Sequence, residues 1–208
     1  MLKGRFPNDG LAVQGAWAAA LVALVSGGLA FANTGEGTVN KGTVDDQWVN
    51  ESRVDDQWVV EQMDDKTVLA SVNGLVMHGD RLRVRLVKGH CDTGNLITSV
   101  YTLAGHPEIT ALENRLVRAK FMGQDIVVKV LFTFPFLAGH RSTVDLGWVP
   151  VAALKDILAA QNPITMAYLD SNEINITAYF DIAENRWMND GLAAALDRAV
   201  AQCRALEG

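Results

Sequence analysis

Three arginines, Arg81, Arg83 and Arg85, alternate with apolar residues across positions 81–87. A period of two is the side-chain period of a β-strand, and it differs from the 3.6-residue period of a helix. The arginines therefore share one face of a strand, which we expect to be solvated, and the apolar side chains share the other. This pattern constrains the middle of the chain to a half-buried sheet.

Other short apolar runs follow the same pattern, with turn residues between them. Residues 58–62 and 67–72 flank a polar turn, which predicts a hairpin. Residues 112–122 fit either a helix or a strand, and as a strand they would form a second hairpin with residues 126–136. Further strands are expected at 96–103, 164–169 and 173–180.

Two segments have helical spacing instead. Pro150 opens a predicted helix over residues 150–161, which ends before Pro163. Asp190 is expected to cap a C-terminal helix that reaches Cys203. This order predicts an α+β fold, mainly an antiparallel β-sheet with sandwich-like packing, one internal helix and a C-terminal helix.

The N-terminal residues 1–32 have the pattern of a secretory signal peptide. Lys3 and Arg5 precede an uncharged run that ends with the small residues Ala30 and Ala32. We expect cleavage near Ala32 and a periplasmic or secreted mature protein. The alternative is an envelope protein held by an uncleaved N-terminal helix, since 22 uncharged residues could span a bilayer, and only then would the chain contact a membrane.

A glycine-rich, polar leader follows the signal segment over residues 33–56. It contains an internal repeat, because Val-Asp-Asp-Gln-Trp-Val occurs at 44–49 and again at 54–59. Two copies are too few for a solenoid, so a local duplication explains them. The apolar pattern continues directly after the second copy, which predicts a single α+β domain over residues 57–208.

Charge limits the partners of this domain. The full chain carries −6, and loss of residues 1–32 removes two basic residues and one acidic residue, which leaves −7. Binding to nucleic acids and to anionic membranes is driven by clustered lysine and arginine. The sequence therefore argues against nucleic acid and favours another envelope or secreted protein as the partner.

The two cysteines, Cys91 and Cys203, are expected to form one disulfide in an oxidising compartment. This bond would join the C-terminal helix to the sheet. A metal site at His90, Cys91 and Asp92 is disfavoured, because three consecutive residues of a strand cannot face one ion. The sequence thus predicts no metal.

No residue pattern points to catalysis or to a cofactor. The sequence lacks the Gly-x-Ser-x-Gly elbow of hydrolases and the glycine loop that binds phosphates. Each of His78, His90, His106 and His140 stands beside a glycine, which places them at turns. If these histidines converge in the fold, the alternative function is that of a periplasmic hydrolase, whose site is assembled only in three dimensions.

Two tryptophans of the repeat, Trp48 and Trp58, are the candidate binding residues, because exposed tryptophans are enriched at recognition surfaces. Packing at the edge of the core is the preferred role of Trp58. The surroundings of Trp48 are polar, so binding and packing remain equal alternatives for it.

Several dispersed features resemble those of known exported proteins. They are Trp58 at the start of a strand, the turn at 64–67, a cysteine after a central strand, and a closing helix that ends in Cys203. Together they make residues 57–206 similar to the invasion-associated locus B family and to VasI-like accessory proteins of type VI secretion. The resemblance implies an exported, β-rich protein without a catalytic site, which acts as a binding or accessory protein through protein–protein contacts.

Overall fold

The computed structural model describes residues 57–76, 80–103 and 107–208. The chain divides into two units, Met1–Gly42 and Thr43–Gly208, and every described residue belongs to the second. The expected signal segment and leader lie outside the described residues, so their predictions stay open.

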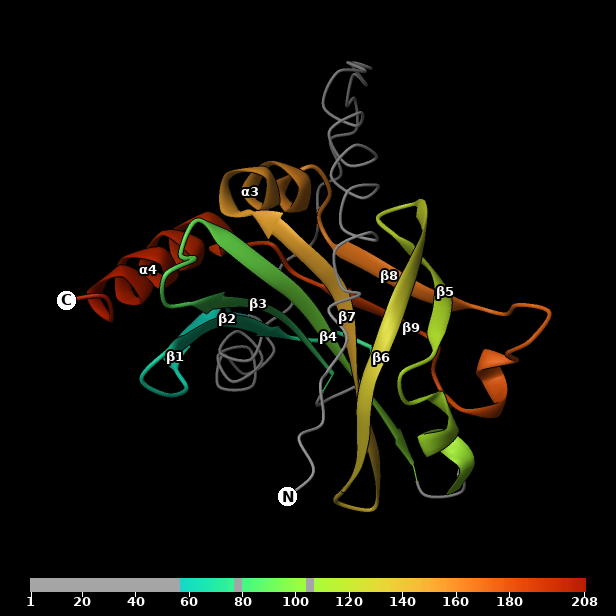
Figure 1. Ribbon diagram of the computed structural model, residues 1–208. Coiled ribbons are helices and arrows are strands. Elements are labelled where there is room, and N and C mark those ends of the chain that lie inside the picture. The colour runs from blue at the N-terminus through green and yellow to red at the C-terminus, as the bar shows by residue number, and fades with distance from the viewer. Residues whose placement is uncertain (1–56, 77–79, 104–106) are drawn as a thin grey trace, which may run out of the picture. The chain divides into compact units, whose positions relative to one another are not determined.

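The second unit is built on one antiparallel sheet with the strand order β1-β2-β3-β4-β7-β6-β5-β8-β9 (Figure 1). The strands are β1 (Val59–Gln62), β2 (Thr67–Asn73), β3 (Arg81–Val87), β4 (Thr93–Leu103), β5 (Leu116–Phe121), β6 (Gln124–Phe136), β7 (Gly139–Pro150), β8 (Ile164–Leu169) and β9 (Glu184–Trp187). The helices are α3 (Val151–Ala159) and α4 (Leu192–Ala205), and two 3-10 turns are η1 (Pro107–Leu112) and η2 (Ile176–Ala178). The predicted α+β class, mainly antiparallel sheet with an internal and a C-terminal helix, is confirmed.

The strongest sequence pattern gives the observed strand. The apolar residues Leu82, Val84 and Leu86 of β3 are fully buried, whereas the alternating arginines are only partly buried. The hairpin of β1 and β2 forms as predicted, and of the two alternatives left open for residues 112–122 the strand is observed, as β5 paired with β6. Period-two alternation therefore identified the strands whose two faces differ most.

Both helices cover the same face of the sheet, which we call the inner face. Helix α4 packs against β1, β2 and β3, and α3 lies beside β4, β7 and α4 (Figure 1). The backbone at Gly94 of β4 approaches this layer closely. A Cβ atom at Gly94 would lie 2.6 Å from Val84 Cγ1 and 3.0 Å from Leu154 Cδ1 of α3. Leu154 thus packs on the face that carries the buried residues of β3.

The sheet curls until its two ends meet. The Trp58 indole Nε1 donates to the Met188 carbonyl oxygen at 2.9 Å, and the Leu75 amide donates to the Arg186 carbonyl oxygen at 2.8 Å. Inside the curl, the hydroxyl of Tyr168 on β8 lies 2.8 Å from the Thr98 hydroxyl on β4. The sandwich-like packing thus arises within one sheet, whose halves enclose the core.

Two strands differ from the sequence prediction. β7 begins at Gly139 and ends at Pro150, where no strand was predicted, and it includes His140, which was expected at a turn. The predicted strand at 173–180 contains η2 instead, and the strand near it is β9. Because Ile174 and Ile176 are both buried, their spacing imitates a strand even though the backbone makes a 3-10 turn. The strand assignment for 173–180 was therefore wrong.

Helix α4 begins without the predicted cap. Gly191 holds the N-cap position with a φ of 79°, and no side chain caps the helix. That left-handed conformation favours glycine. Asp190 instead lies 3.5 Å from the amide nitrogen of Asn162. The Asp190 cap is therefore wrong, although the helix itself is present.

Candidate functional site

The opposite, outer face of the sheet brings together cationic and aromatic side chains from four strands. Strand pairing places Arg83 beside Ile97 of β4, and Arg141 of β7 between Tyr101 of β4 and Phe134 of β6. Paired residues of an antiparallel sheet point to the same side. We call this surface the arginine–aromatic face, and it consists of Arg81, Arg83, Arg85, Tyr101, Phe132, Phe134, Phe136, Arg141 and Trp148.

Neutral acceptors hold the arginines of β3 in place. Arg81 Nε donates to the Asn73 side-chain oxygen at 3.0 Å, and Arg83 Nη1 donates to the Ser99 hydroxyl. Burial of the Arg83 guanidinium, followed by the charges of Arg81 and Arg141, lowers the pKa of Arg83 to about 10. Arg83 stays charged at neutral pH. The face is therefore less solvated than the sequence predicted, and its positive charges repel one another.

Arg85 joins the cationic row to an exposed indole. Its guanidinium carbon lies 5.4 Å from the centroid of the Trp148 ring, within the range of a cation–π contact. Arg85 Nη2 also donates to Asn95 Oδ1 at 3.0 Å, and Asn95 Nδ2 in turn donates to Asp145 Oδ1 at 2.6 Å. An amide thus separates this arginine from the nearest carboxylate of its network.

Aromatic rings continue the face along β6. Arg141 lies over the Phe136 ring at 3.7 Å from its centroid, and the Tyr101 ring meets Phe136 edge-on at 6.1 Å. Phe134 lies between Phe136 and Phe132, with centroid distances of 6.3 Å and 6.1 Å. Phe132 is 48% exposed and therefore offers an apolar surface to a partner.

Only part of this face is predictable from the sequence. The arginines of β3 were identified, but Arg141 is remote in sequence and enters through strand pairing. A signal for the rings was present, since Phe132, Phe134 and Phe136 alternate in β6 and must share one side of the strand. Residues 126–136 were predicted only as one strand of a hairpin, and the two faces of that strand were not considered separately.

Of the two tryptophans predicted to bind a partner, the structure describes only Trp58. Trp58 is 5% exposed, and its indole is bonded to the Met188 carbonyl, so it has a packing role in this structure. Trp48 lies outside the described residues. Recognition by Trp48 stays a prediction.

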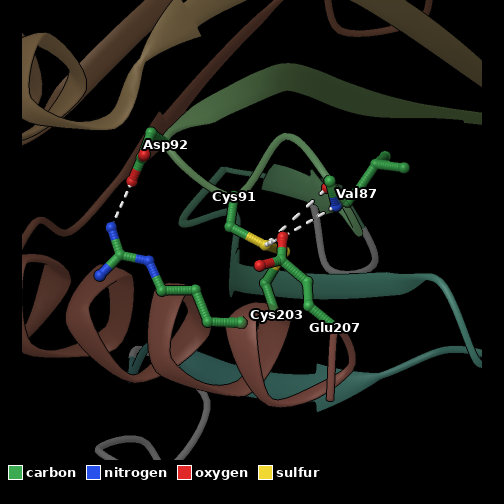
Figure 2. Close-up of a disulfide and its surroundings, with 7 residues drawn as sticks. Val87, Cys91, Asp92, Cys203 and Glu207 are labelled. Carbon is green, nitrogen blue, oxygen red and sulfur yellow. Dashed lines mark hydrogen bonds and ion pairs between the residues drawn. A yellow bond between two sulfur atoms is a disulfide. The ribbon is translucent and has the colours of Figure 1, made fainter.

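The predicted disulfide is present and joins α4 to the start of β4 (Figure 2). Cys91 and Cys203 are bonded at 1.99 Å, with their Cα atoms 5.7 Å apart. Beside the bond, Arg204 of α4 pairs with Asp92 at 2.5 Å. A pocket of about 360 Å³ opens here, lined by Gly89, His90, Cys91, Asp92, Thr93, Arg204 and Glu207. The disulfide therefore closes the helix onto the sheet, as predicted.

The histidines that the structure describes do not converge. His90 precedes one end of β4, whereas His140 pairs with Thr102 near the other end of that strand. His140 is the second residue of β7, not a turn residue as predicted. His78 and His106 lie outside the described residues. Within the described ranges, no group of three or more histidine, cysteine, aspartate or glutamate side chains could hold a metal ion.

The carboxyl group of Asp80 is buried where the two ends of the sheet meet. Asp80 accepts hydrogen bonds from the Tyr101 amide at 2.6 Å and from the Asn185 side chain at 2.7 Å. Burial raises the pKa of Asp80 to about 6, against the opposing effect of these hydrogen bonds. Because Asp80 connects the start of β3 to β9, its evident contribution is to join the two ends of the sheet.

Comparison with protein families, with characterised proteins and with solved structures finds no match to this chain. Among the residues that the structure describes, neither helix is long and apolar enough to cross a membrane.

Proposed function

We propose that this chain is an exported, non-catalytic binding or accessory protein, and that it acts on another envelope or secreted protein through the arginine–aromatic face. The observation that carries the proposal is the composition of that face. Arginine and aromatic side chains are enriched in protein–protein interfaces and supply most of their binding hot spots. Trp148 and Phe132 are 38% and 48% exposed, so a partner can reach them.

Geometry also supports a protein partner. The face spans β3, β4, β7 and β6, and it presents rings at successive outward positions of β6. A broad face of this kind suits a polypeptide better than a small molecule, whose sites are usually concave. The resemblance to the invasion-associated locus B family and to VasI-like accessory proteins points in the same direction.

Export is part of the proposal. A Cys91–Cys203 bond suits an oxidising compartment such as the periplasm or the exterior of the cell. N-terminal sequencing of exported protein should begin at or near Asn33. Recovery of the chain with Met1 intact in a membrane fraction would favour the anchored alternative.

The partner site is tested by quantitative cross-linking and mass spectrometry in the cells that make the protein. A partner protein recovered with the unchanged chain should be reduced at least tenfold by Phe132→Ser combined with Trp148→Ser. The matched control is Met63→Ser, which removes an apolar side chain that is 58% exposed in the β1–β2 turn. The control should keep the partner. Equal recovery with all three chains would exclude the arginine–aromatic face as the binding surface.

A further inference from the structure

The two cysteines of the disulfide differ in their access to solvent. Cys91 is among the described residues that line the adjacent pocket of about 360 Å³, and Cys203 is not. Cys91 is 5% exposed, whereas Cys203 is fully buried in α4. Thiol–disulfide exchange requires that the attacking thiolate reach a sulfur atom of the bond. A thiol from solvent therefore meets Cys91 before Cys203.

A carboxylate reaches the same sulfur from the end of α4. Glu207 follows Cys203 by four residues, and the Leu206 amide donates to the Cys203 carbonyl oxygen at 3.1 Å, which continues the helical path between them. Residues four apart on a helix share one face. The Gly89 amide donates to Glu207 Oε1 at 3.0 Å, and this oxygen lies 3.4 Å from Cys91 Sγ (Figure 2). Because a disulfide sulfur carries no proton, the second distance is a direct contact of a carboxylate with sulfur.

The charge of Glu207 is not offset by an ion pair among the described residues. Arg204, which lines the same pocket, lies 2.5 Å from Asp92, so these two side chains neutralise each other. Glu207 belongs to none of the ion pairs in the described ranges. His90 also lines the pocket and is exposed. The charged group in contact with Cys91 Sγ is therefore negative.

The nucleophile in thiol–disulfide exchange is also negative, because the thiolate and not the thiol attacks. We propose that Cys91 is the site at which small thiols exchange with this disulfide, and that Glu207 slows the exchange by repelling the attacking thiolate. Glu207 acts here as a positioning and shielding residue, since it forms no bond in the reaction. The inference is independent of the arginine–aromatic face.

The exchange proceeds in two displacements. The thiolate of a small thiol forms a bond to Cys91 Sγ while the bond to Cys203 Sγ breaks, and the electron pair leaves on Cys203, which takes a proton from water. A second thiolate attacks the mixed disulfide at the sulfur of the small thiol and releases Cys91 as a thiolate. Two small thiols are thereby oxidised to their disulfide, and the protein disulfide is reduced by two electrons.

One face of α4 supplies both the bond and its protection. Cys203 and Glu207 contact Cys91 together, because both lie at the end of the same helix. When α4 packs against the sheet, Cys91 gains its bonding partner and a repelling carboxylate in the same step. A chain whose α4 has not packed lacks both, so its Cys91 reacts with thiols without this protection.

The rate of reduction in the folded state tests the proposal. The oxidised full chain is treated with 2-mercaptoethanol without denaturant, and free thiols are counted over time. Glu207→Gln removes the negative charge and keeps an oxygen that can accept the Gly89 hydrogen bond. We expect the second-order rate constant to rise about fivefold or more at low ionic strength, and about 1 M salt should remove most of the difference.

A matched control removes a carboxylate elsewhere. Asp156→Asn changes the net charge of the chain by the same amount, and Asp156 is an exposed residue of α3 that does not line the pocket. Its rate constant should equal that of the unchanged chain. Equal rates for the unchanged and Glu207→Gln chains would overturn the proposal, as would equal acceleration by Asp156→Asn.

Thiols of different charge separate repulsion from a loosened C-terminal turn. Mercaptoethanesulfonate, 2-mercaptoethanol and cysteamine are similar in size, and their net charge becomes less negative in that order. Repulsion predicts that the acceleration caused by Glu207→Gln decreases in the same order. Equal acceleration with all three thiols would show that the substitution acts through structure alone and would contradict the role of charge.

Trapping the mixed disulfide identifies the attacked sulfur. Acid quenching at early times, followed by mass spectrometry, should find the small thiol on Cys91 and a free thiol at Cys203. The rate should also be proportional to the thiol concentration, because attack occurs on the folded chain. An adduct on Cys203, or a rate that does not depend on thiol concentration, would exclude the pocket beside Cys91 as the site of exchange.

Discussion

The two faces of this sheet are formed by the same strands, but they differ in the burial and in the bonding of their side chains. On the inner face, Leu82, Val84 and Leu86 are fully buried beneath helices. On the outer face, the side chains of the intervening arginines donate hydrogen bonds to neutral groups. The inner face is closed by apolar packing, whereas these arginines of the outer face form no ion pair among the residues that the structure describes. We therefore expect stability to depend mainly on the first face, and the proposed recognition of a partner to depend on the second.

Loss of the disulfide, which lies on the helix-covered side of the sheet, should have the largest effect on stability. Replacement of Cys91→Ala together with Cys203→Ala should lower the free energy of unfolding by about 3–4 kcal/mol, because the unfolded chain loses a long closed loop. The thermal midpoint measures this loss. Recovery of a cross-linked partner through the outer face should persist below the new midpoint. Lost binding with an unchanged midpoint would instead indicate a functional thiol at Cys91.

A matched pair of leucines compares the faces directly. Leu86→Ala on the inner face should destabilise by about 2–5 kcal/mol, because a fully buried side chain leaves a cavity. Leu116→Ala on the outer face removes a side chain that is 60% exposed and should change stability by about 0.5 kcal/mol or less. Urea unfolding midpoints provide the measurement. Equal losses at the two positions would refute the division of roles.

The smallest expected effect is a pH dependence at Asp80. Its pKa is near 6 in the folded state and lower when unfolded, so the folded state binds the extra proton. This contribution to stability is complete below the unfolded pKa and disappears as pH rises through 6. Acidification from pH 7 to pH 5 should therefore stabilise the chain by about 1 kcal/mol. The free energy of unfolding, measured at both pH values, should not show this increase in an Asp80→Asn chain. The same increase in that variant would contradict the role of Asp80.

Local periodicity predicted the parts of the fold whose two faces differ in polarity. The β1–β2 hairpin, β3 and both helices were found in this way. β7 escaped because its inner side carries Ser142 as well as Val144, so its alternation is weak without its neighbours. β9 is short and polar, and only its pairing with β8 identifies it.

The candidate site was predictable to a similar extent. The row of Arg81, Arg83 and Arg85 follows from spacing alone. Partial burial of Arg83, and the approach of Arg141 to Phe136, depend on which strands pair across the sheet. Sequence separation between β3 and β7 hides this relation, because no local pattern specifies that β7 inserts between β4 and β6.

The position of Cys203 has a consequence for biosynthesis. Cys91 precedes β4, and its partner follows 112 residues later in α4. A ribosome must therefore complete six strands and α3 before the second thiol exists. During that interval Cys91 can pair only with a thiol of another molecule. Any mixed disulfide that Cys91 forms in that interval must be exchanged before the native bond can form.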